Sequence, residues 1–153
     1  MLLMKKVGLN SGFMIPQYTT AALVTENKTL CFPASADSIP TSLGQEDHVS
    51  MGSISGRKLN QVIDNLEYIL AIELLTACQA IEFRRPLKSS ELLEFAHKHV
   101  REYVSFAEED RVFADDVNKV KQMIAGFSFV SAVNEFALSR KVILNENFYA
   151  FQL

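Results

Sequence analysis

The 153-residue chain is long enough for one domain with a hydrophobic core, because 48% of its residues are hydrophobic and 22% are charged. Its net charge is −3 and its basic residues form only isolated pairs, which argues against a nucleic-acid partner. No apolar run is long enough to span a membrane, and the first lysines follow an apolar run, the reverse of a secretory signal. Alternating strand patterns are scarce, so the chain is predicted to be all-α.

The first predicted helix spans residues 13–30, where one face follows the three-four spacing of a helix. Its small, weakly polar face predicts close packing, so we expect this helix to be buried among others. Residues 31–44 are rich in serine and proline and predict a loop. Ser42-x-x-Gln45 matches a capping box. A second helix is therefore expected to begin directly after it, with Glu46 in its first turn.

The longest predicted helix covers residues 57–83, and its apolar stripe widens to nearly all faces from Tyr68 onward. A helix that is apolar all round must be buried on several sides, which indicates an oligomer or a larger parent protein. Pro86 stops this helix, and Ser89 or Ser90 is expected to cap the next one.

The last predicted helix covers residues 115–142, and Gly126 within it marks a kink or a close contact. The tail that follows has too many aromatic residues for a free tail in water, so we expect it to dock on the protein. These aromatic residues are Phe148, Tyr149 and Phe151. The sequence thus predicts a single helical domain over residues 1–153.

The candidate site with the densest polar side chains is the run Gln45, Glu46, Asp47 and His48. The simpler interpretation of Glu46 is a first-turn carboxylate, which stabilises a helix N-terminus by roughly 0.3–1 kcal/mol. The alternative is a binding site in which the carboxylate and the helix start orient a charged ligand. Adjacent helical residues do not face each other, so a catalytic pair of Asp47 and His48 is not expected.

Other candidate residues lack the spacing of a functional site. Cys31 and Cys78 form no CxxC pair and no metal-ligand spacing, which favours a reduced, cytoplasmic chain. His97 and His99 are two positions apart, unlike a helical metal pair, and are expected to be surface or partly buried residues. The charged run at residues 108–111 is expected to be a solvated turn or a local ion pair. No metal site is predicted.

Several motifs closely resemble those of histidine ammonia-lyases. They are "NSGFM", "AALVTENK", "PASADSIPTS" and above all "QEDHVSMG", followed by "EFRRPLKSS" and "EEDR". The resemblance covers residues 1–116 almost unbroken and is weaker in residues 117–153, which hold the C-terminal helix and the aromatic tail. It implies an all-α long-helix bundle like the C-terminal part of the aromatic amino acid ammonia-lyase fold. It also implies a homotetramer with active sites where several subunits meet.

The resemblance implies a specific chemistry as well. These enzymes eliminate ammonia from L-histidine to give urocanate, using an electrophilic methylidene-imidazolone group made from an internal Ala-Ser-Gly. Glu46 matches the family's substrate-contacting glutamate in "QEDHVSMG", and Gln45 beside it is a second substrate-binding candidate. Gln45, Asp47 and His48 also match positions that shape the loop. The Glu46 carboxylate can accept a hydrogen bond from imidazole or act as a catalytic base, and both roles stay open.

The sequence departs from the family at the electrophile. Neither Ala34-Ser35-Ala36 nor Ile54-Ser55-Gly56 is the precursor triplet, and the family's other site residues lie upstream of the matched region. We therefore expect a C-terminal lyase fragment that supplies no cofactor and is inactive alone, and that assembles as a homo-oligomer or with a complementary N-terminal lyase fragment. The alternative is a non-catalytic oligomerisation module left from a truncated lyase. A phenylalanine or tyrosine lyase is disfavoured, because those enzymes carry Gln at the position of Glu46.

Overall fold

A computed structural model describes residues 3–6, 8–50 and 52–144 of the chain. Over these residues the protein is helical, which confirms the predicted all-α class. The described residues form no β-strand, only one isolated antiparallel bridge between Thr41 and Glu46. The predicted docking of the aromatic tail concerns positions outside the described residues. The elements are α1 (Met14–Leu30), the 3-10 turn η1 (Ser42–Gly44), α2 (Gly52–Glu82), α3 (Glu91–Arg101), α4 (Phe113–Ala125) and α5 (Ser128–Ser139).

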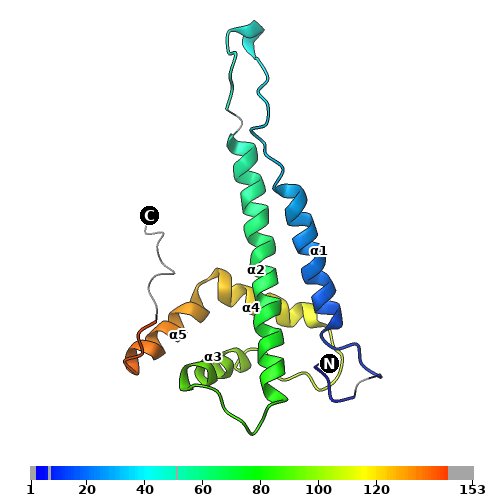
Figure 1. Cartoon of the computed structure of the whole chain (residues 1–153), viewed down its shortest axis with the longest axis vertical. Coiled ribbons are helices and arrows are strands. Elements are labelled where there is room, and N and C mark those ends of the chain that lie inside the picture. Colours follow the sequence, from blue (N-terminus) through cyan, green and yellow to red (C-terminus); the bar gives the residue numbers. More distant parts are fainter. Residues whose placement is uncertain (1–2, 7, 51, 145–153) are drawn as a thin grey trace.

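The molecule is built around the long helix α2. Helix α1 lies beside α2, and the loop that joins them forms one end of the molecule (Figure 1). Helices α3, α4 and α5 gather at the other end, where α2 packs against both α3 and α4. The loop that joins α1 to α2 is therefore far from the part of the chain where most helices meet.

The hydrophobic core lies at that second end, because only there does α2 have helices on more than one side. Its buried members come from α2, α3, the segment after α3, and α4. They are Ala71, Ile72, Leu75, Cys78, Val100, Val104, Val117, Val120 and Met123. The half of α2 nearest the loop keeps large apolar side chains exposed, including Ile63 (45% exposed) and Leu66 (46%). The buried apolar residues of α2 thus lie after Tyr68, where the predicted apolar surface widens, and the apolar residues nearer the loop stay exposed.

Helix α1 begins and ends close to its predicted bounds but is not buried. Only Pro16 of α1 is buried, whereas Ile15, Tyr18 and Val24 are exposed. The prediction of burial among other helices was wrong for this chain alone, because α1 packs chiefly on α2.

The last predicted helix is interrupted and forms α4 and α5. The chain breaks at Gly126 and Phe127, and Phe127 adopts a left-handed backbone with φ of 57°. A Cβ on Gly126 would stand 3.0 Å from the carbonyl oxygen of Gln122, so the break brings the backbone too close for a side chain. The single continuous helix was wrong, whereas the position marked by Gly126 was right. The break allows α5 to turn back and pack on α3.

The charged run at residues 108–111 does more than form a local turn. Arg111 makes the expected local ion pair, at 2.7 Å from Asp116. Asp110, however, reaches across the chain and accepts hydrogen bonds from the backbone N–H groups of Ser11 (2.7 Å) and Gly12 (2.8 Å). These donors precede Phe13, the N-cap of α1, so Asp110 fixes the segment that leads into that helix from a distant part of the sequence.

Candidate functional site

The loop of residues 31–50 carries the polar run predicted as a site. The position of this loop is set by α1 and α2, which are joined to each other through a buried side-chain amide. Asn65 on α2 is 2% exposed and donates hydrogen bonds to the side chains of Asn27 (2.9 Å) and Glu26 (3.1 Å) on α1. Gln61, one turn earlier on α2, donates to the Asn65 oxygen at 3.1 Å. A buried amide with satisfied partners specifies one register of the two helices, and hence one placement of the loop between them.

The tip of this loop is a tight backbone turn. Thr41 and Glu46 exchange two backbone hydrogen bonds, with N–O distances of 2.9 and 3.3 Å. Between them Ser42, Leu43 and Gly44 all have positive φ angles, of 53°, 58° and 83°. Three successive residues in the left-handed region reverse the chain direction. The turn therefore delivers Glu46 onto the returning leg of a hairpin.

The predicted capping box is absent from this turn. Ser42 has a left-handed backbone, whereas a helix N-cap residue has an extended one. Gln45 follows the 3-10 turn, and no α-helix begins there. The described part of α2 starts only at Gly52. Glu46 is therefore not in a first helical turn, and stabilisation of a helix N-terminus does not explain it. The expectation failed because the spacing Ser42-x-x-Gln45 also suits a turn in which the side chains make no reciprocal bond.

The side chains of residues 45–48 are all exposed at the loop tip. Within the described chain, the Glu46 carboxylate accepts no hydrogen bond and forms no ion pair, and the same holds for the amide of Gln45. His48 points toward a small cavity of about 120 Å³, whose lining includes Asp37 and Ser50. The structure thus brings Gln45 and Glu46 together on one exposed hairpin. A carboxylate with no partner of its own is available to a ligand or to another polypeptide.

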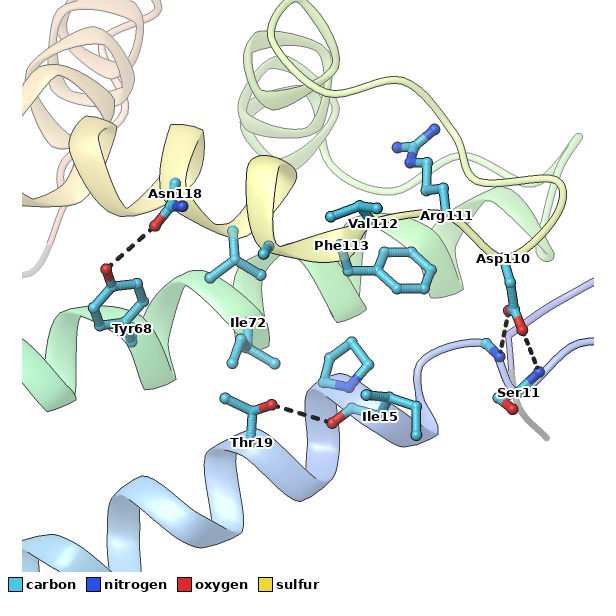
Figure 2. Close-up of a pocket in the computed structure, with 14 residues that line it drawn as sticks. Ser11, Ile15, Thr19, Tyr68, Ile72, Asp110, Arg111, Val112, Phe113 and Asn118 are labelled. Carbon is cyan, nitrogen blue, oxygen red and sulfur yellow. Dashed lines mark hydrogen bonds between the residues drawn. The ribbon is translucent and has the colours of Figure 1, made fainter.

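A larger hollow of about 600 Å³ lies between α1, α2 and α4, far from Glu46 (Figure 2). Its wall is mostly apolar, and its polar groups already have partners. The Tyr68 hydroxyl donates to Asn118 at 3.2 Å, the Thr19 hydroxyl donates to the Ile15 carbonyl at 3.3 Å, and Asp110 is bonded to the start of α1. With these groups engaged, the described lining of the hollow offers no free carboxylate or imidazole.

The sequence also gave no signal for an ion-pair cluster where α2 meets α3. His97 is only 7% exposed, so its expected surface or partly buried position was wrong. Its Nε2 lies 3.0 Å from a carboxylate oxygen of Glu82, and its Nδ1 lies 3.4 Å from Nη2 of Arg85. Because Arg can only donate, Nδ1 is the acceptor and Nε2 carries the proton. Among the described residues this Nε2 makes no hydrogen bond, and Glu82 is its neighbour by distance alone. The cluster thus holds a neutral imidazole in one tautomer.

Burial and charge set the ionisation of this cluster. Desolvation lowers the pKa of His97 below its ordinary value, although Glu82 opposes the shift. The hydrogen bond from Arg85 lowers the pKa of Glu94 to about 2. His99, the other histidine of α3, is partly buried as expected and stacks on Phe95. These ion pairs join the end of α2 to α3 and line a hollow of about 550 Å³. Their charged groups are paired with one another, which indicates a structural role.

The described residues hold few groups that could carry a cofactor or a metal. Burial raises the pKa of the Cys78 thiol to about 11, so this buried side chain is protonated at neutral pH. Among residues 3–6, 8–50 and 52–144, no three His, Cys, Asp or Glu side chains are placed to bind a metal ion. Over the same residues, no helix combines the length and apolarity needed to cross a membrane. Ala34-Ser35-Ala36 lies in the loop and has Ala where a methylidene-imidazolone precursor has Gly, so it does not fit that group.

Comparisons with known proteins agree with the resemblance drawn from the motifs. The aromatic amino acid lyase family matches residues 1–102. A histidine ammonia-lyase of Desulfotalea psychrophila is 54% identical over 127 residues, which are 83% of this chain and 25% of that protein. The chain thus spans about a quarter of the length of such relatives.

Solved structures share the fold. The crystal structure of histidine ammonia-lyase from Trypanosoma cruzi matches with a TM-score of 0.84 and 50% identity, over 88% of this chain and 27% of that one. A tyrosine aminomutase from Streptomyces globisporus matches with a TM-score of 0.80 and 37% identity, over 85% of this chain and 25% of that one. These matches confirm the predicted long-helix architecture. Because a lyase and an aminomutase share it, the fold alone does not choose the reaction.

Proposed function

Because this chain belongs to the aromatic amino acid lyase family, we propose that it forms the Glu46-bearing part of a histidine ammonia-lyase. The complete enzyme of this class converts L-histidine to urocanate and ammonia. The observation that carries the proposal is the exposed hairpin, which presents a carboxylate that no described residue of this chain engages. In this proposal the exposed carboxylate of Glu46 acts on a ligand that another polypeptide holds in part.

The chemistry of Glu46 suits histidine as the substrate. A carboxylate is an acceptor for the imidazole N–H, which a phenyl ring does not have, so it favours histidine over phenylalanine. Its other possible role is that of a base that removes a proton near the reacting carbon. Gln45, the adjacent exposed amide, is the second substrate contact. Both side chains reach a substrate only from outside this chain, because they point from the loop tip into solvent.

The remaining parts of the site come from elsewhere in this proposal. Methylidene-imidazolone supplies the electrophile in this family when it is present, and no triplet in this chain fits its precursor. A complementary N-terminal lyase segment, or further copies in a homotetramer, therefore completes the site. In this proposal the isolated chain is inactive, and the assembled enzyme is cytoplasmic.

A second candidate function is a non-catalytic oligomerisation module. The observation that favours it is the uncovered apolar surface of the helix pair. Ile15 and Tyr18 on α1 are 55% and 67% exposed, and Leu59 on α2 is 57% exposed. Large apolar side chains gathered on two neighbouring helices are typical of an assembly surface. This candidate shares the assembly of the first proposal but assigns no role to Glu46.

Reconstitution of activity tests the proposed function. The chain is coexpressed with an upstream lyase segment that carries Ala-Ser-Gly, and urocanate formation from L-histidine is followed by ultraviolet absorbance. Activity is expected from the pair and not from either part. Robust turnover by the isolated chain would contradict the composite site. Absence of turnover from a stable, purified complex would instead support the oligomerisation module.

Substitution of Glu46 separates its two possible roles in that complex. In Glu46→Gln the amide still accepts an imidazole N–H but cannot take up a proton. If the carboxylate only contacts imidazole, KM for histidine is expected to rise about tenfold, the difference between charged and neutral hydrogen bonds. If it is the base, kcat is expected to fall by roughly 10²–10⁴. Glu135→Gln, on the exposed surface of α5, is the matched control. Equal kinetics for Glu46→Gln and the control would exclude both roles.

A further inference from the structure

A single serine hydroxyl ties the two legs of the hairpin that carries Glu46. The backbone N–H of Val49 donates to Oγ of Ser38 at 3.0 Å, and the same hydroxyl lies 3.4 Å from the Val49 carbonyl oxygen, to which it donates. Ser38 and Val49 are eleven positions apart. Both backbone groups of Val49 are therefore satisfied by one side chain from the opposite leg.

This contact takes the place of a rung in an antiparallel ladder. The neighbouring rung is the backbone bridge between Thr41 and Glu46, which no side-chain substitution removes directly. In the described part of the loop, the Ser38 hydroxyl is the one side-chain group that bonds across from leg to leg. Ser38 is also half-buried, whereas residues 39–48 at the tip are exposed. Below the backbone bridge, the described side-chain contact between the two legs is thus this one hydroxyl.

We infer that Ser38 is a positioning residue for Glu46, holding the returning leg so that the carboxylate meets its ligand in one place. The inference rests on the proposed function of Glu46. Besides the two rungs, one further bond holds the loop, from Lys58 on α2 to the carbonyl oxygen of Phe32 at the start of the first leg. That bond does not reach the returning leg, and the tip makes no contact with the helical core. Displacement of a catalytic group by about 1 Å costs up to about 100-fold in rate, so a tie at the base of the hairpin controls activity.

The competing explanation is that Ser38 merely stabilises the loop, with no consequence that passes through Glu46. A double-mutant cycle separates the two in the reconstituted complex. If Ser38 acts by placing the carboxylate, Ser38→Ala lowers kcat/KM by about five- to tenfold when Glu46 is present, the factor that corresponds to one hydrogen bond. In a Glu46→Ala background, where no side chain is left to be placed, it then has little further effect. A general loss of structure lowers kcat/KM equally in both backgrounds.

Two further variants serve as controls for the double-mutant cycle. Ser38→Thr keeps the hydroxyl and is expected to retain activity near that of the unmodified chain. Ser35→Ala removes an exposed hydroxyl of the same loop that bonds to no described residue, and is expected to change nothing. Equal losses in the two backgrounds, or no rescue by threonine, would overturn the role of Ser38.

Hydrogen exchange on the 153-residue chain gives a readout that does not depend on lyase activity. Ser38→Ala is expected to speed exchange in residues 41–50 by about five- to tenfold, with α1 and α2 unchanged. Unchanged exchange in that segment would refute the tie. If the unmodified complex forms no urocanate, the proposed function fails, and faster exchange in Ser38→Ala still establishes the tie while removing its link to catalysis.

Discussion

Gln79 offers the sharpest test of what holds the helical end together. It lies on α2, is 1% exposed, and its amide nitrogen donates to the carbonyl oxygens of Leu3 (3.0 Å) and Ala107 (2.7 Å). The Gln79 oxygen accepts from the Ala107 N–H at 3.2 Å. One side chain therefore satisfies three backbone groups of two segments that lie far apart in the sequence.

Replacing Gln79 by Leu keeps the volume and removes all three bonds. Ala107 is itself 1% exposed, so its N–H and carbonyl groups are left buried and unpaired. Each orphaned group costs about 1–3 kcal/mol. Burial of a more apolar side chain offsets roughly 1–2 kcal/mol of this. The free energy of unfolding is thus expected to fall by about 2–4 kcal/mol.

Urea unfolding followed by circular dichroism measures this change at matched protein concentrations, because self-association shifts the midpoint. Gln122→Leu is the control, since Gln122 is exposed on α4 and its side chain bonds to no described residue. The control is expected to stay within about 0.5 kcal/mol of the unmodified chain. A Gln79→Leu variant as stable as the control would refute the assignment of these three bonds as structural.

Two further predictions concern charged groups. Burial lowers the pKa of His97 below its ordinary value near 6.5, so the unfolded chain binds this proton at higher pH than the folded chain does. The free energy of unfolding is therefore expected to fall as pH drops through 6.5 toward the folded-state pKa. In urea titrations over this pH range, His97→Gln is expected to show a smaller fall than the unmodified chain. An equal fall in the two proteins would contradict the contribution of His97. Asp110→Ala removes the acceptor for the N–H groups of Ser11 and Gly12 and is expected to cost about 1 kcal/mol in urea unfolding. Glu135→Ala is its control, because this exposed carboxylate on α5 bonds to no described residue, and equal stability of the two would argue against a structural role of Asp110.

Local sequence patterns predicted most of the helices because each pattern is satisfied within a few turns. The apolar stripe placed the long helix at 57–83, and the structure has it at Gly52–Glu82. Ser90 was one of two expected caps, and its hydroxyl accepts from the N–H of Leu93 at 3.4 Å. Periodicity and capping are properties of neighbouring residues, so no tertiary contact is needed to recognise them.

The candidate site was found only in part from the sequence. The polar run and the family motif singled out Glu46, but the pattern Ser42-x-x-Gln45 predicted a helix where the chain turns back. The role inferred for Ser38 has no sequence signal, because its partner Val49 is eleven positions away and offers only backbone atoms.

The sequence by itself determined the all-α class, the long central helix and the identity of the exposed carboxylate, since these depend on composition and short-range spacing. Only the tertiary structure decided that His97 is buried against Glu82, that Asp110 binds the backbone just before α1, and that Glu46 stands on a hairpin away from the core. Each of these depends on groups distant in the chain meeting in space. Their partners are backbone N–H groups or single charges, which many other positions in the same sequence also provide.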